Sequence, residues 1–196
     1  HRIYNQESET GITFHYVDET FDTGDIIFQY KAPLNPDETI GTLFVRSSFM
    51  ASGFYVDMLN KLENGEQLPR YKQQEILSGY KYASEVTPNS PILKINWLDR
   101  ASKVDALVRA ANPFFGALSI FRCSIVRIFS GNYDETISNN PNIPVGTVVK
   151  TNQNMMAIVT GQGLYYPKVL QYGLVYLCDI NEFIYRSSLK EGEQFL

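Results

Sequence analysis

Four acidic side chains lie close together near the start of this chain and could carry out proton-transfer chemistry. Residues 9–29 read ETGITFHYVDETFDTGDIIFQ, and the acids are Asp18, Glu19, Asp22 and Asp25. A carboxylate held in a fixed loop can orient a water molecule or a neighbouring imidazole, or relay a proton. Asp22 is the best candidate, because Thr23 and Gly24 follow it and a glycine lets the backbone turn sharply beside a flat ligand.

Other interpretations of this acidic stretch are possible. The DTG tripeptide at Asp22 is typical of aspartic proteases, but their site needs two such aspartates sharing a proton. The chain contains one DTG, and the adjacent Asp25 would add a like charge beside the pair. The ligand spacing of a calcium-binding EF-hand is not met. A solvated turn without chemistry remains open from the residues alone.

Two β-strands are expected to hold the acidic loop. Apolar and polar residues alternate over residues 12–17, and strand character resumes over residues 25–30 until Pro33 and Pro36 end it. A loop fixed between two strands is a common place for a scaffold to display functional groups. His15 lies within the first strand, and we interpret it as a structural residue whose ring is satisfied by its neighbours.

A long helix should follow the second strand. The acids and proline of residues 36–39 are typical of a helix start, and the helix should stop at Asn64 and Gly65. The residues at helical spacing, which we expect to form a core stripe against a sheet, are Ile40, Leu43, Met50, Phe54, Met58 and Leu62. Residues 66–95 are polar and contain three prolines, which predicts an extended connector between domains.

The second half of the chain has a different pattern. A short helix is expected over residues 102–111, and a final helix should start at Asp179 with Glu182 forming a capping box. Between them, short β runs cover residues 118–121, 124–129, 146–150, 156–160 and 164–170, separated by Gly, Asn and Pro. Many short strands at such spacing predict a small barrel or sandwich.

Composition limits the possible functions. With 196 residues, 44% hydrophobic content and 13% aromatic content, the chain is long and apolar enough to form a core. Its net charge of −4 provides no general basic field for DNA or other nucleic acid. Cys123 and Cys178 lack zinc-site spacing, so we expect no metal and reduced, buried thiols in a cytoplasmic protein. We also expect no membrane span and no signal peptide.

Residues 11–27, GITFHYVDETFDTGDII, resemble the cofactor loop of the folate-dependent formyltransferases, and among them the methionyl-tRNA formyltransferases. That family carries a stretch similar to GVTIHxMDEGxDTGDIL. Further resemblances extend along the chain: ETIGTL at 38–43, KYASEVT at 81–87, INW at 95–97, RAANPFFGA at 109–117 and VGTV at 145–148. The lysine of the family's YAPKLT connector is not matched.

The resemblance implies a catalytic role for Asp22 as one member of an Asn, His and Asp trio. It implies that the loop from Val17 through Asp18 and Glu19 to Asp22 holds the pterin ring of 10-formyltetrahydrofolate, largely through backbone groups. The reaction is then attack of a primary amine on the formyl group, without a metal. The family's Asn, His and SLLPxYRG loop would lie upstream of residue 1, so we expect the 196-residue chain alone to be inactive.

The resemblance also implies an architecture. Residues 1–68 would be the C-terminal part of a Rossmann-like α/β formyltransferase domain, residues 69–95 an extended connector, and residues 96–196 a mostly-β, OB-like barrel. The acceptor would be initiator methionyl-tRNA, with an amino-sugar nucleotide as the alternative and a non-catalytic binding module as a third possibility. The basic residues that could bind the acceptor are Arg122, Arg127, Lys150 and Lys168. A structural role within its RAANP element is the alternative for Arg109.

Overall fold

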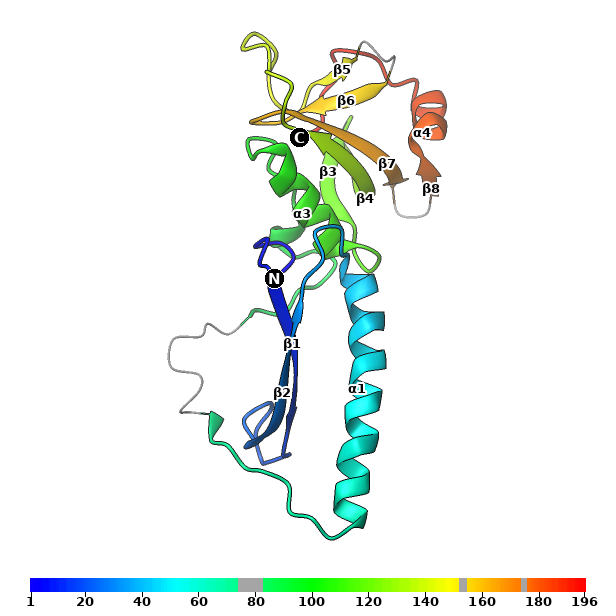
Figure 1. The fold of residues 1–196 in the computed structure, drawn as a ribbon. Helices are drawn as coiled ribbons and strands as arrows, with labels where there is room; N and C mark the ends of the chain where they lie inside the picture. Colours follow the sequence, from blue (N-terminus) through cyan, green and yellow to red (C-terminus); the bar gives the residue numbers. More distant parts are fainter. Residues whose placement is uncertain (74–82, 152–154, 174–175) are drawn as a thin grey trace.

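A β-hairpin at the start of the chain carries the acidic loop at its tip. The computed structural model describes residues 1–73, 83–151, 155–173 and 176–196. Strands β1 (Glu9–His15) and β2 (Ile26–Pro33) pair antiparallel, as the alternation predicted. Their register shifts between Phe14 and His15, which is a β-bulge next to the loop. The hairpin and a long helix form the lower half of the molecule (Figure 1).

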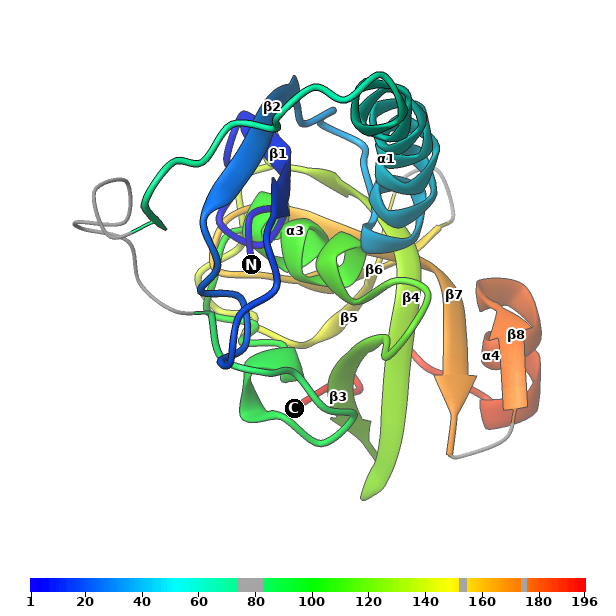
Figure 2. The same ribbon diagram turned by 90° about the horizontal axis from the view of Figure 1, so that it is seen from below.

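Helix α1 (Ile40–Glu63) runs alongside the hairpin (Figures 1 and 2). Thr39 and Thr42 form a reciprocal capping box at its start, and Asn64 caps its end with Gly65 at a φ of 78°. The predicted helix is therefore confirmed. The expected core stripe is wrong, because no residue of α1 is buried. Two strands are too narrow to cover a helix of this length, although Phe54 does pack against the rings of Phe28 and Tyr30.

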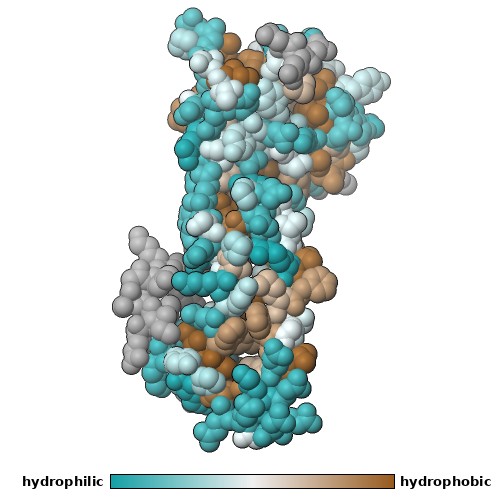
Figure 3. All heavy atoms as spheres, in the orientation of Figure 1, coloured by the Kyte–Doolittle hydropathy of each residue, from teal (hydrophilic) through white to brown (hydrophobic). Residues whose placement is uncertain are grey.

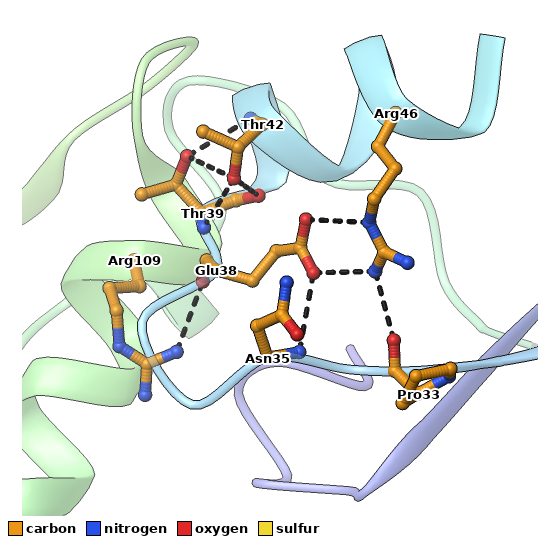
Figure 4. A network of polar contacts seen from close by, with 7 residues as sticks. All are labelled: Pro33, Asn35, Glu38, Thr39, Thr42, Arg46 and Arg109. Carbon is orange, nitrogen blue, oxygen red and sulfur yellow. Dashed lines mark hydrogen bonds and ion pairs between the residues drawn. The ribbon is translucent and has the colours of Figure 1, made fainter. Parts of the chain in front are cut away.

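A buried charge ties the start of α1 to the second half of the chain. Glu38 is only 5% exposed, and Arg46 binds its carboxylate through two nitrogens, at 3.1 and 2.5 Å. The backbone N–H of Asn35 also donates to it, while Arg109 donates to the carbonyl of Glu38 at 3.1 Å (Figure 4). These partners offset the cost of removing the carboxylate from water. Arg109 therefore has a structural role at this junction.

Helix α3 (Ala101–Ala111) follows a short 3-10 turn, η1 (Pro91–Leu93), and lies between the hairpin and the main sheet (Figures 1 and 2). Most of its residues are buried, which confirms the predicted helix. Its N-cap residue, Arg100, makes no side-chain capping bond. Instead, the Glu135 carboxylate accepts a hydrogen bond from the Ser102 backbone N–H at 2.7 Å. A residue distant in sequence thus stabilises the start of this helix.

The second half is built on an antiparallel sheet in the order β3-β4-β7-β6-β5, with β8 also paired to β7. The strands are β3 (Ala117–Phe121), β4 (Ser124–Asp134), β5 (Val148–Lys150), β6 (Met156–Val159), β7 (Leu164–Tyr172) and β8 (Tyr176–Asp179). The first five match the predicted β runs, and β8 was missed. It runs directly into the helix start at Asp179, with no Gly, Pro or Asn to separate strand from helix.

The end of the chain joins the two edges of this sheet. Leu196 exchanges backbone hydrogen bonds with Ile120 in β3, at 2.8 and 2.9 Å. One residue earlier, Phe195 donates to the carbonyl of Gly146, and Glu193 accepts from the backbone N–H of Val148 in β5. The last residues therefore pair on one side with β3 and on the other with β5. The result is a mostly antiparallel half-barrel whose two edge strands are connected.

The core of the molecule lies inside this half-barrel. Trp97, Phe121, Tyr165 and Phe195 are among its buried side chains, and Phe121 stacks on Phe195 with ring centroids 4.9 Å apart. Helix α4 (Ile180–Ser187) adds Phe183 to this core. Its N-cap is Asp179, as predicted, but Glu182 bonds to Tyr176 and Arg186 rather than completing a capping box.

The expected connector is described only in part, because residues 74–82 lie outside the described residues, including Lys81 and Tyr82 of the resemblance at 81–87. Residues 70–73 do not form a free linker but run along the base of the hairpin loop. The backbones of Tyr71 and Ile26 exchange two hydrogen bonds, at 2.8 and 2.9 Å. Among the described helices, none is long and apolar enough to cross a membrane.

Candidate active site

Asp22 occupies a strained position at the tip of the hairpin. Its φ of 58° is in the left-handed region, which a non-glycine residue adopts at a cost of about 1–2 kcal/mol. Its side chain is 80% exposed, so the carboxylate points into solvent and can reach a ligand. Strain of this kind is found at functional sites more often than elsewhere, and it motivates a functional hypothesis for Asp22.

The shape of the loop is set by close backbone contacts at Gly24. A Cβ atom added to Gly24 would lie 1.6 Å from the carbonyl oxygen of Tyr16, so a larger residue cannot occupy this position without moving the loop. Next to it, the backbone N–H of Tyr16 donates to the carbonyl of Asp25 at 2.8 Å. The sequence predicted a sharp turn after Asp22, and the structure has one.

Asp18 stabilises the loop from within. Its carboxylate accepts hydrogen bonds from the Thr23 hydroxyl at 2.7 Å and from the Thr20 backbone N–H at 3.1 Å. The Thr23 hydroxyl, followed by the Thr20 backbone, lowers the pKa of Asp18 below its usual value, because both donors favour the charged form. In this structure Asp18 therefore fixes the loop through its side chain.

Backbone groups at the front of the loop are open to a ligand. Val17 is 94% exposed, and Glu19 is exposed as well. Within the described residues, the backbone N–H and C=O groups of Val17, Asp18 and Glu19 have no hydrogen-bond partner in the protein. Unpaired donors and acceptors in a fixed loop are groups that can read the edge of a heterocycle.

Two groups of residues near Asp22 were missed by sequence reasoning. His15 Nε2 lies 3.5 Å from Asp22 Oδ1, although we interpreted His15 as a purely structural residue. Residues 70–73 contact the loop from the other side: Lys72 Nζ lies 3.1 Å from Asp25 Oδ1, and the Arg70 guanidinium lies 3.7 Å from the centre of the Tyr16 ring. The basic run RYK, opposite an acidic loop, was the signal available in the sequence.

The four basic residues considered for binding the acceptor differ in their contacts: the two arginines are hydrogen-bonded within the protein, and the two lysines are exposed. Arg122 binds Glu193 and the carbonyls of Ser187 and Ser188, and Arg127 binds the carbonyls of Phe115 and Pro88. Both guanidinium groups are thus occupied by bonds within the protein. Lys150 at the end of β5 and Lys168 in β7 are exposed.

A cavity among the described residues lies away from Asp22. It has a volume of about 480 Å³ and is lined by residues of the α1 start, α3 and β4, including Asp105, Arg109 and Tyr133. These elements meet at the opposite end of the hairpin from the acidic loop (Figure 1). Burial raises the pKa of Asp105 there, although Arg109 donates to its carboxylate at 2.7 Å. The cavity belongs to the junction between the two halves.

Comparison with known families accounts for both halves of the chain. The protein-family model described as "Formyl transferase" matches residues 3–59, and the family model "Formyl transferase, C-terminal domain" matches residues 93–187. Together they include the acidic loop, most of α1, all of α3 and every strand of the half-barrel.

The chain belongs to the formyl transferase family. A methionyl-tRNA formyltransferase from Dictyoglomus turgidum is 27% identical over 194 residues, which is 98% of this chain and 60% of that protein. The chain thus spans about 60% of the length of the curated relatives that it matches over nearly its whole length.

Solved structures share the fold of this family member. HypX from Aquifex aeolicus, at 16% identity, has a TM-score of 0.73 over 97% of this chain and 34% of its own, and a further HypX structure was solved in complex with tetrahydrofolic acid. An N-formyltransferase from Helicobacter canadensis, solved with folinic acid and dTDP-3-aminofucose, is 22% identical with a TM-score of 0.59 over 89% of this chain and 59% of its own. At these identities the likeness shows the fold alone.

Proposed function

We propose that this chain contributes the Asp22 loop to a folate-dependent formyltransferase site, which transfers a formyl group from 10-formyltetrahydrofolate to a primary amine. The observation that carries this proposal is the loop itself, a strained and exposed Asp22 beside unpaired backbone groups in a member of the formyl transferase family. Relatives solved with tetrahydrofolic acid and with folinic acid support a folate donor.

Each part of the loop has a defined role in this proposal. The folate supplies the formyl group when it is bound. The backbone of Val17, Asp18 and Glu19 binds the pterin edge, and the Asp18 side chain holds these groups in place. Asp22 keeps the partner imidazole of the trio in its working protonation state and helps to move the proton that leaves the attacking amine. Polar groups around the formyl carbon stabilise the oxyanion.

We propose methionyl-tRNA as the acceptor, because several relatives matched over nearly the whole chain are methionyl-tRNA formyltransferases. The half-barrel, which we interpret as an OB-like domain of residues 96–196, would contact the RNA, with residues 69–95 as connector and 1–68 as part of the catalytic domain. Lys150 and Lys168 are exposed and can reach phosphates, while Arg122 and Arg127 would have to release carbonyl groups first.

An amino-sugar nucleotide is the second candidate acceptor. The Helicobacter canadensis structure contains dTDP-3-aminofucose, and the net charge of −4 does not favour a polyanion such as tRNA. Formyl transfer from labelled 10-formyltetrahydrofolate should be measured with each acceptor in the complete natural polypeptide that contains these residues. We expect transfer to methionyl-tRNA that weakens steeply with salt. Transfer to the sugar alone would favour the alternative, and transfer to neither would leave a binding module.

The same assay tests whether the chain suffices by itself. Because no residue of this chain matches the family's catalytic Asn and His, we expect no transfer above background from the isolated 196 residues. Normal turnover from this chain would contradict the assignment of those roles to residues outside it.

A further inference from the structure

Burial does not hold Asp22 in place. Its carboxylate is 80% exposed and its backbone is in the left-handed region, so an isolated loop would gain by relaxing to another conformation. A side chain that handles protons must nevertheless be held within a fraction of an ångström of its working position. Two contacts from outside the loop meet this need.

The first contact comes from Gln73. Its side-chain amide donates to the carbonyl of Asp22 at 3.0 Å and to the carbonyl of Gly24 at 2.7 Å, so one group bridges the strained residue and the turn that follows. Gln73 is itself anchored two residues earlier, where Tyr71 and Ile26 exchange backbone hydrogen bonds. The amide is therefore delivered to the loop by a segment that is paired with β2.

Ion pairs to Asp25 also fix the segment 70–73. Asp25 is largely buried at the base of the loop, with Lys72 Nζ at 3.1 Å and an Arg70 nitrogen at 3.6 Å. Both cations precede Gln73 by at most three residues, so these ion pairs also hold the segment 70–73 against the loop.

The second contact to Asp22 comes from His15. His15 is the last residue of β1, beside the register shift, and its Nδ1 lies 2.9 Å from the carbonyl of Tyr16. Since a carbonyl only accepts, Nδ1 must carry a hydrogen and donate it. Nε2 then faces Asp22 Oδ1 at 3.5 Å, and the contact is an ion pair when Nε2 is protonated as well.

We propose that His15 and Gln73 are positioning residues for Asp22, with His15 orienting the carboxylate and Gln73 fixing the backbone that carries it. The functional part of this proposal rests on the proposed formyl transfer. The structural part does not, and the two are tested by separate measurements.

Hydrogen exchange on the 196-residue chain tests the structural part. Gln73→Glu keeps the size of the side chain but places a carboxylate against two carbonyls, so the amides of Tyr16 and Ile26 should exchange about tenfold faster than in the unchanged chain. Gln73→Lys, which can still donate to both carbonyls, should restore slow exchange. The matched control is Gln29→Glu on the exposed side of β2, which should leave both amides unchanged. Equal exchange in Gln73→Glu and the control would overturn the proposal.

Kinetics in the complete natural polypeptide test the functional part. His15→Phe and Gln73→Glu should each lower kcat by about 10- to 100-fold, because small displacements of a catalytic group are that costly, while the KM for the acceptor changes little. His15→Asn, which retains a donor, should recover part of kcat, and the exposed His1→Phe is the control. Unchanged kcat in an active enzyme would refute the positioning role. If the unchanged enzyme transfers no formyl group, the proposed function fails, and the exchange experiment still decides whether these residues hold Asp22.

Discussion

At the scale of single residues, Asp18 and Asp22 lie in the same loop but do different work. Asp18 is bonded to Thr20 and Thr23, whereas Asp22 projects into solvent. The sequence placed both in the candidate site, because spacing and residue type are the same for a structural and a catalytic acid. Only the hydrogen bonds of each side chain distinguish the two roles, and these bonds depend on the three-dimensional path of the loop.

Removing the Thr23 hydroxyl should raise the pKa of Asp18. Thr23→Val deletes the largest of the influences that lower it, so the carboxyl should titrate closer to 3.8 than in the unchanged chain. Because the folded-state pKa of Asp18 is lowered, its carboxylate stabilises the loop fully above pH 3.8. This contribution is lost as the pH falls through the folded-state pKa. Carbonyl NMR of Asp18 measures the change. An unaltered titration would show that the Thr23 bond is not formed in solution.

At the scale of elements, periodicity and punctuation predicted the hairpin, α1, α3, α4 and the first five strands of the half-barrel. Local signals fix such elements, because Gly, Pro and capping residues act within a few positions. The contact between residues 70–73 and the hairpin was not predictable in this way. It joins segments about 45 residues apart, and the backbone pairing of Tyr71 with Ile26 leaves no periodic pattern.

The distant cap of α3 gives a prediction at this scale. Glu135→Ala removes the acceptor of the Ser102 N–H and should lower the free energy of unfolding by about 1 kcal/mol, the usual loss for a helix N-cap. The bond to Ser102 keeps the pKa of Glu135 below 4.5, so the contribution is present above pH 4.5 and disappears as the pH falls through the folded-state pKa. Urea unfolding at pH 7 and pH 3.5 measures it. Equal losses at both values would contradict the charge-dependent cap.

At the scale of the whole molecule, the two halves differ in how they are stabilised. Both hydrophobic clusters among the described residues lie in the second half, whereas α1 has no buried residue. Apolar side chains remain visible over the hairpin and α1 (Figure 3). The sequence predicted apolar stripes for both regions. It could not show that only the stripes of the second half are buried, because burial depends on how the other helices and strands pack against them.

The buried Phe195 side chain near the chain end should contribute strongly to the stability of the second half. Phe195→Ala removes a side chain that is 2% exposed and packed against Phe121, and it should cost about 3–5 kcal/mol. Leu196→Ala is the matched control, because Leu196 is 62% exposed and pairs through its backbone. It should cost less than about 0.5 kcal/mol, as surface substitutions do. Similar losses in chemical unfolding would refute the core role of the Phe195 side chain.

The most direct test of the central claim is the turnover of Asp22→Asn in the complete natural polypeptide. The amide keeps the shape of the side chain but cannot hold the charge, so kcat for formyl transfer should fall by at least about 100-fold, the range of general acid–base contributions. Asp57→Asn, an exposed acid on α1, serves as the control and should retain normal kcat. Wild-type turnover in Asp22→Asn would contradict a catalytic role for this loop.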